Sequence, residues 1–315
     1  ALYVVLLLSG INLVTADLGR HLVNGERFLQ DWRVLETNTY SYTHPDFPAP
    51  NHHWLFGVLA YLTFLAAGFT GVHFAFIAVS VATFLIFFSI AQKKAGVLLT
   101  SVAALVLLPI IAERAEVRPE ALSYFFAGVS FLLLRNYRAG TLTAGKLGLA
   151  LGLIQIVWVN SHIYFFLGWV LVGVFLFESA VLNGLRAQRT KTLALCFILV
   201  FAVSLVNPFF LMGMFAPFTI FSDYGYRLVE NQSVWLLHRV LNRPLLFYFE
   251  LMFAMLAASF VYVFLRDRQS TQPAEVLLGA GCGAAATLAL RNFTLFGLFA
   301  LPLLAENAAR LLPRA

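Results

Sequence analysis

Charged residues are scarce in this 315-residue sequence. Only 11% of its residues are Asp, Glu, Lys or Arg, whereas 61% are hydrophobic, and the mean hydropathy is +0.84. A soluble domain carries roughly 25% charged residues, so a chain this apolar cannot cover its surface in water. The composition excludes a soluble globular protein and predicts an integral membrane protein.

Cysteine is nearly absent, and basic residues are never clustered. Cys196 and Cys282 both lie inside apolar segments, where cysteine is typical of a small core residue, so a disulfide framework is not expected. The net charge is +6, but Lys and Arg occur singly or in pairs beside apolar stretches. This arrangement does not indicate nucleic-acid binding.

Long apolar stretches are abundant instead, and they predict an all-α fold. A helix needs roughly 20 apolar residues to cross a bilayer. We expect a single polytopic transmembrane bundle over 1–315 with about ten spans, near 1–16, 70–92, 97–112, 120–135, 146–160, 163–184, 192–206, 245–265, 274–290 and 293–309. Two long polar segments, 17–69 and 207–244, interrupt them.

The short apolar stretch 54–68 decides the topology. If it does not cross, the short loops with paired Lys and Arg all fall on one side, which the positive-inside rule identifies as the cytoplasm. If it crosses, the first loop and the later acidic loops separate onto opposite faces. We therefore expect 54–68 to lie along the outer interface, both termini to be cytoplasmic, and 17–69 and 207–244 to be extracytoplasmic loops. We expect the membrane to be a bacterial inner (plasma) membrane.

The first loop begins with an expected amphipathic helix over 17–30, in which Leu18 and Leu22 recur at helical spacing between Arg20 and His21. A hydroxyl-rich stretch over 37–46 predicts an ordered turn. An ordinary interfacial belt of Trp and Tyr is the alternative interpretation. The density of Asp, Arg and His at one membrane boundary exceeds what such a belt requires.

Other polar residues interrupt the apolar stretches at the same depth. Five charges lie between 113 and 120, Asn160 and His162 follow Trp158, and Arg291 divides the last two spans. Each of them alone is equally explained as a helix cap or a satisfied polar group between helices. Together they predict that the helices converge on one polar cavity roofed by the two long loops.

Several strings resemble one family of membrane enzymes. They are DLGRHLVNGERFLQDWRVLETNTYSYTHPDFPAPNHHWLFGVLAY from residue 17, with its D-x-x-x-H-x-x-x-G, SYT and HxWL elements, followed by RPEALSYF, WVNSH and RNFTLFGLFALP. In this order they resemble the GT-C superfamily of membrane glycosyltransferases, which includes the protein O-mannosyltransferases and the aminoarabinose transferase of lipid A. The resemblance covers about the first 160 residues in order and the rest more loosely.

This resemblance implies transfer of a sugar from a polyprenyl-phosphate carrier to an acceptor glycan, lipid or protein on the extracytoplasmic face. Asp17 is the implied general base, with Glu113 and Glu116 as further catalytic candidates. In some members, acids of the two outer loops hold a divalent cation, which leaves open a Mg²⁺ or Mn²⁺ ion on Asp17 and Glu116. The substrate-binding candidates are Arg20, His21, His52, His53, Arg118, Asn160, His162, Arg227, Arg239, Arg243 and Arg291.

The positions of the arginines predict which of them contacts the carrier phosphate. Arg239, Arg243 and Arg291 have no acid within five residues, so at least one of them is expected to face the carrier phosphate. Three other functions remain open: a non-catalytic member of the same fold that binds a lipid carrier or a partner, a transporter or flippase, and a structural membrane subunit. A working Glu178, which lies inside a span, would favour the transporter.

Overall fold

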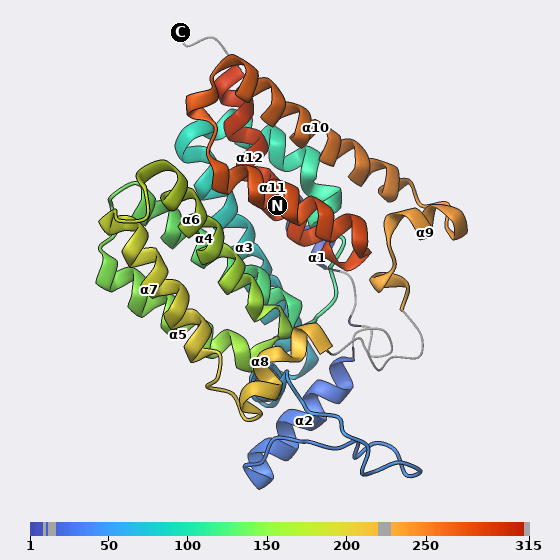
Figure 1. Cartoon of the computed structure of the whole chain (residues 1–315). Coiled ribbons are helices and arrows are strands. Elements are labelled where there is room, and N and C mark those ends of the chain that lie inside the picture. Colours follow the sequence, from blue (N-terminus) through green and yellow to red (C-terminus); the bar gives the residue numbers. More distant parts are fainter. Residues whose placement is uncertain (9–10, 12–16, 220–227, 312–315) are drawn as a thin grey trace.

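The computed structural model describes residues 1–8, 11, 17–219 and 228–311, and this part of the chain is all-helical (Figure 1). Its only recorded pairing of extended backbone is the isolated bridge between Thr37 and Pro48. The helices are α1 (Leu2–Leu7), α2 (Leu18–Asp31), α3 (Trp54–Ile111), α4 (Glu120–Arg138), α5 (Ala144–Ser161), η1 (Ile163–Phe165), α6 (Phe166–Asn183), α7 (Gln188–Val203), α8 (Phe210–Thr219), η2 (Val229–Asn231), α9 (Val234–Val240), α10 (Pro244–Arg266), η3 (Arg268–Ser270), α11 (Pro273–Leu288), η4 (Leu290–Asn292) and α12 (Phe293–Leu311).

Helix α3 is one long element whose backbone is broken at internal positions. Its 58 residues would span roughly 87 Å at 1.5 Å per residue, far more than a bilayer. Non-helical backbone angles at Ala67, Gly68 and Gly96 divide it into three segments, and both glycines have positive φ, which glycine adopts without steric cost. The breaks confirm the boundaries predicted between 54–68, 70–92 and 97–112.

Four helices of the described chain are long and apolar enough to cross a membrane: Trp54–Ile111, Ala144–Ser161, Ile163–Asn183 and Pro244–Arg266. They are consistent with an integral membrane protein. The predicted count of about ten spans is not confirmed, because several expected spans form shorter or more polar helices. Most of the first expected span, 1–16, lies outside the described residues.

The predicted amphipathic helix over 17–30 is present as α2, and it packs on α3 through glycine. A Cβ atom on Gly25 would lie 2.2 Å from the carbonyl oxygen of Gly57, so the two backbones touch directly. The face of α2 that packs inward includes Leu18, His21 and Leu22, as the spacing predicts. This contact fixes the first turn of α2, with its polar side chains, against the bundle.

Helices α4, α11 and α12 connect two charged regions of the protein. The 113–120 junction precedes α4 and η4 connects α11 to α12, whereas Arg135, Glu275 and Glu306 lie at the opposite ends of these three helices. About 15 residues of helix, or roughly 22 Å, separate Glu120 from Arg135 along α4. A core rich in phenylalanine, with Phe87 and Phe131 both packed on Phe299, fills the space between.

Candidate functional site

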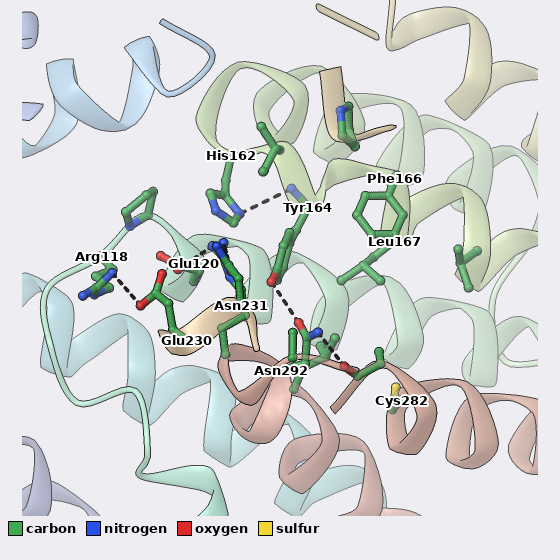
Figure 2. A pocket seen from close by; sticks show the side chains of 18 of the residues that line it. Arg118, Glu120, His162, Tyr164, Phe166, Leu167, Glu230, Asn231, Cys282 and Asn292 are labelled. Atoms are coloured by element: carbon green, nitrogen blue, oxygen red, sulfur yellow. Dashed lines mark hydrogen bonds and ion pairs between the residues drawn. The ribbon is translucent and has the colours of Figure 1, made fainter. Parts of the chain in front are cut away.

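A cavity of about 650 Å³ opens at the α2 end of the bundle and continues between α6 and α11. Figure 2 shows its two parts: Arg118, Glu120, Glu230 and Asn231 gather at one end, and Phe166, Leu167 and Cys282 lie at the other. Tyr164 and Asn292 lie between them and share a hydrogen bond of 2.8 Å, donated by the Tyr164 hydroxyl. We call this space the amphipathic cavity.

The apolar part of the amphipathic cavity exists because one face of α11 carries small residues. Gly281, Cys282 and Ala285 line it from α11, opposite Leu167 and Val170 of α6. A Cβ atom on Gly281 would meet no heavy atom within 4 Å, so the space beside it is open. Together with Pro217 of α8, these side chains form a wall suited to a hydrocarbon chain.

The first turn of α2 supplies Asp17, Arg20 and His21 to the polar end. Asp17 has a φ of 54°, in the left-handed region that non-glycine residues rarely adopt, and its side chain is 62% exposed. Its carboxylate accepts a hydrogen bond of 3.2 Å from Arg20 Nη2. Backbone strain of this kind concentrates at functional sites, and here it holds a carboxylate at the cavity.

Three histidines from three different segments form a row along the polar end, with His21 and His162 buried and His53 half-buried. The ring centroids of His21 and His53 are 5.7 Å apart, and those of His53 and His162 are 5.1 Å apart. Ser123 Oγ lies 2.8 Å from His162 Nδ1 and itself accepts a hydrogen bond from Trp158 Nε1. The backbone N–H of Tyr164 also donates to His162 Nδ1 at 3.4 Å, so Nδ1 acts as an acceptor and the His162 ring is neutral.

Burial keeps the whole row neutral. Desolvation, reinforced by the Arg20 cation, lowers the pKa of His21 to about 3. Burial likewise lowers the pKa of His162 to about 3 and that of His53 well below its ordinary value. The row therefore adds polar nitrogen atoms to the cavity at neutral pH without adding positive charge.

Positive charge enters the cavity through arginines that are paired with acids. Arg291 Nη2 donates to Glu120 at 3.0 Å, and Arg291 Nη1 donates to Asn231 at 3.1 Å. Arg118 Nη1 donates to Glu230 at 3.4 Å. Glu120 is only 4% exposed, so its charge is balanced by Arg291 rather than by solvent.

Seven residues predicted for the site line this cavity: Asp17, Arg20, His21, His53, Arg118, His162 and Arg291. The convergence expected of Asp17, His53, His162 and Arg291 is thus confirmed, although they come from distant parts of the chain. Their association explains why single charges occur at several helix ends in the sequence.

The other predicted residues of the described chain do not line the cavity. Glu113 pairs with Arg243 at 3.4 Å, and Glu116 pairs with Arg118 at 2.9 Å, so both expected catalytic acids turn to arginine partners instead. The expectation that Glu113 or Glu116 joins Asp17 in the cavity is therefore wrong. The carboxylate that reaches the cavity from this junction is Glu120.

Three further candidates, His52, Asn160 and Arg239, lie outside the cavity lining. His52 packs edge-on against Phe209 at 5.3 Å between ring centroids. Asn160 accepts a hydrogen bond from Trp54 Nε1 at 2.9 Å and donates to two backbone carbonyls, which fixes α5 against the start of α3. Arg239 is exposed and is absent from the cavity lining. Arg227 lies outside the described residues.

The arrangement of acids does not fit the divalent cation considered for Asp17 and Glu116. Glu116 is held by Arg118, and only Asp17 of the two lines the cavity. No three His, Cys, Asp or Glu side chains in the part of the chain that the structure describes are placed to hold one metal ion.

Sequence reasoning missed Glu120, Glu230 and Asn231. Glu120 follows Pro119 at the start of α4, where an acid is a common helix-capping residue, so its sequence position gives no sign of a cavity. Glu230 and Asn231 lie in η2 of the second long loop, and only the fold brings them to Arg118 and Arg291. The polar character of that loop was the available signal.

The transporter hypothesis gave Glu178 a functional role, but this residue is held in place. Its carboxylate accepts a hydrogen bond from Arg138 Nη1 at 3.2 Å and another from the backbone N–H of Ala274 at 3.0 Å. An acid at the N-terminus of a helix is stabilising, so Glu178 anchors the first turn of α11 to α6. These contacts give it a structural role.

No protein-family model, curated protein sequence or solved structure matches this chain. The functional interpretation therefore rests on the residues and geometry of the amphipathic cavity.

Proposed function

We propose that this protein is a membrane glycosyltransferase that moves a sugar from a polyprenyl-phosphate carrier to an acceptor at the α2 end of the bundle. The observation that carries the proposal is a single cavity that is charged at one end and apolar along its length. A polyprenyl-phosphate sugar has the same division, with a sugar and phosphate at headgroup depth and a hydrocarbon chain in the bilayer. The charge distribution of the loops supports an extracytoplasmic position for this end.

In sugar transfer, the protein positions the two substrates and stabilises the charge that develops on the phosphate. An acceptor hydroxyl attacks the anomeric carbon, the bond from that carbon to the phosphate oxygen breaks, and the electron pair leaves with the phosphate. Asp17 takes the hydroxyl proton as general base. The carrier phosphate changes from a diester with one negative charge to a monoester with about −1.5 to −2 charges. Arg118 and Arg291 line the cavity where they would stabilise this growing charge.

A non-catalytic protein that binds the same lipid phosphate is the second candidate. The observation that favours it is the pairing of the two cavity carboxylates, because Asp17 lies 3.2 Å from Arg20 and Glu120 lies 3.0 Å from Arg291. A general base must be released from such a pair, or act while bound to it. The two functions predict the same ligand and differ only in the role of Asp17.

The test is the release of carrier phosphate from short-chain polyprenyl-phosphate sugars, with a panel of hexose, pentose and aminosugar donors. In the enzyme, Asp17→Asn lowers the release rate by about 100-fold or more, the range for loss of a general base, and leaves donor affinity nearly unchanged. Asp46→Asn is the matched control, because Asp46 is an exposed acid of the same loop.

Two results would count against this function. Equal release rates for the wild type and Asp17→Asn would contradict the role of Asp17. Donor binding without any release from the panel in the presence of acceptor lipids and glycans would support the binding protein instead.

A further inference from the structure

Two arginines of the 113–120 junction converge on one oxygen of Glu230. Arg114 Nη1 donates to Glu230 Oε2 at 2.8 Å, and Arg118 Nη1 donates to the same atom at 3.4 Å. Arg114 and Arg118 are 11% and 14% exposed, so both guanidinium groups are largely removed from water. Two cations from one short segment directed at a single oxygen form an arrangement typical of anion recognition.

The Glu230 carboxylate leaves donor groups of Arg114 without an acceptor in the described chain. Nε and Nη2 of Arg114 and Nε of Arg291 are buried and have no hydrogen-bond acceptor in the described chain. A buried donor without an acceptor is costly, most of all on a charged group. A phosphate group has more acceptor oxygens and more negative charge than a carboxylate, so it suits this set of donors better.

Glu230 also lies between Arg114 and the amphipathic cavity. Glu230 and Arg118 line the cavity (Figure 2), whereas Arg114 is not among its lining residues. The segment that carries Glu230 is attached next to it, through the hydrogen bond from Arg291 to Asn231 and through the Leu290 N–H to Gln232 carbonyl bond of 3.3 Å. The Glu230 side chain can therefore swing away while its backbone remains attached to η4.

We propose that the Glu230 carboxylate occupies the phosphate position of the unliganded protein, and that an isoprenoid phosphate displaces it to reach Arg114 and Arg118. This inference rests on the proposed function, because it takes the same class of ligand. Glu230 then acts as an internal competitor that weakens binding of the phosphate and eases its release after transfer. The cation pair keeps a counter-charge at every stage, so neither arginine is left buried and unpaired.

The test is the equilibrium affinity for farnesyl phosphate in detergent. Glu230→Gln removes the competing charge and keeps the shape, so the dissociation constant falls by about tenfold, the lower end for exchange of one hydrogen bond to a charged group. Arg114→Gln raises it by about tenfold on the same grounds. Glu116→Gln is the matched control, because Glu116 also pairs with Arg118 but does not line the cavity, and it leaves the affinity within about threefold.

Two further ligands distinguish a lipid phosphate from free phosphate. Farnesol tests the chain alone and inorganic phosphate tests the head alone, and both bind more weakly than farnesyl phosphate. If inorganic phosphate binds as tightly as farnesyl phosphate, the site takes free phosphate and the lipid assignment is overturned.

The results that overturn the inference differ from those that overturn the function. If the wild type binds farnesyl phosphate and Glu230→Gln binds it equally well or more weakly, Glu230 is a structural clasp and the inference is wrong, while the proposed function stands. If neither protein binds farnesyl phosphate, both are wrong. Glu230→Gln decides the inference even if Arg114→Gln fails to fold.

Discussion

The protein has two concentrations of charge at opposite ends of the same helices, and they are built differently. At the α2 end, Arg118, Glu230 and Arg291 line a cavity of about 650 Å³. At the far end, Arg135 and Glu275 lie in a network beside a cavity of about 80 Å³. Both regions pair arginine with glutamate, so residue type does not distinguish them.

The far-end network leaves almost no room for a ligand. Its members are Lys94, Arg135, Arg138, Glu178, Glu275, Glu306 and Arg310. Glu275 is within ion-pair distance of three arginines, Arg135, Arg138 and Arg310. Both Glu275 and Glu306 are 1% exposed. The network connects α3, α4, α6, α11 and α12 at one level. The comparison shows that arginine–glutamate pairs join helices where the space is filled and form a binding site where space is left beside them.

The largest loss of stability is expected from a substitution at Glu275. Replacement of Glu275 by Gln leaves three arginines with too little buried negative charge, so the free energy of unfolding falls by about 3–5 kcal/mol, the range for breaking a buried ion pair. Glu230→Gln, the same change at the cavity, costs much less because the Glu230 side chain is 22% exposed and both Glu230 and Arg118 line the cavity. Thermal unfolding in detergent measures both. Equal losses at the two positions would show that the two regions are built alike.

The histidine row predicts a smaller effect, and one that depends on pH. The pKa of His21 and of His162 is about 3 in the folded protein and about 6.5 in the unfolded chain. As the pH falls below about 6.5, the unfolded chain takes up protons that the folded protein does not, so each of these histidines lowers stability by up to about 1.4 kcal/mol per pH unit. The contribution is fully present above pH 6.5 and is lost as the pH falls toward 3.

Melting temperatures between pH 7.5 and 5 measure this dependence. His162→Gln removes one titrating group, so its melting temperature falls less steeply with acidification than that of the wild type. The control is His44→Gln, because His44 is exposed in the first loop and its loss leaves the slope unchanged. A slope unaltered by His162→Gln would contradict the account of the row.

The elements and the convergence of the site followed from local patterns. The amphipathic spacing of 17–30 predicted α2, and the limits of the apolar stretches 54–68, 70–92 and 97–112 predicted where α3 is divided. Polar residues at the ends of apolar stretches predicted one cavity, because helix ends of equal depth meet at one face. Asp17, His53, His162 and Arg291 were found in this way.

The sequence did not predict which arginine pairs with which glutamate. Arg138 and Glu275 are 137 residues apart, and Arg135 and Glu306 are 171 apart. The positive-inside rule accounted for both arginines as loop residues, and a lone acid in an apolar helix gives no sign of its partner. The same limit explains why Glu113 and Glu116 were preferred to Glu120: the three acids of that junction differ only in the direction in which the turn before α4 points them.

The central claim is that the amphipathic cavity holds a phosphate head and a hydrocarbon chain at once. Cys282 is 9% exposed and lines the apolar part, so it serves as a native reporter in a Cys196→Ser background. The measurement is the rate at which an apolar maleimide labels Cys282. Saturating farnesyl phosphate is expected to slow labelling by about tenfold or more, farnesol to slow it less at equal concentration, and inorganic phosphate to leave the rate unchanged. Labelling of Cys196 in a Cys282→Ser background provides the control, with no protection expected. An unchanged labelling rate of Cys282 at saturating farnesyl phosphate would contradict the account.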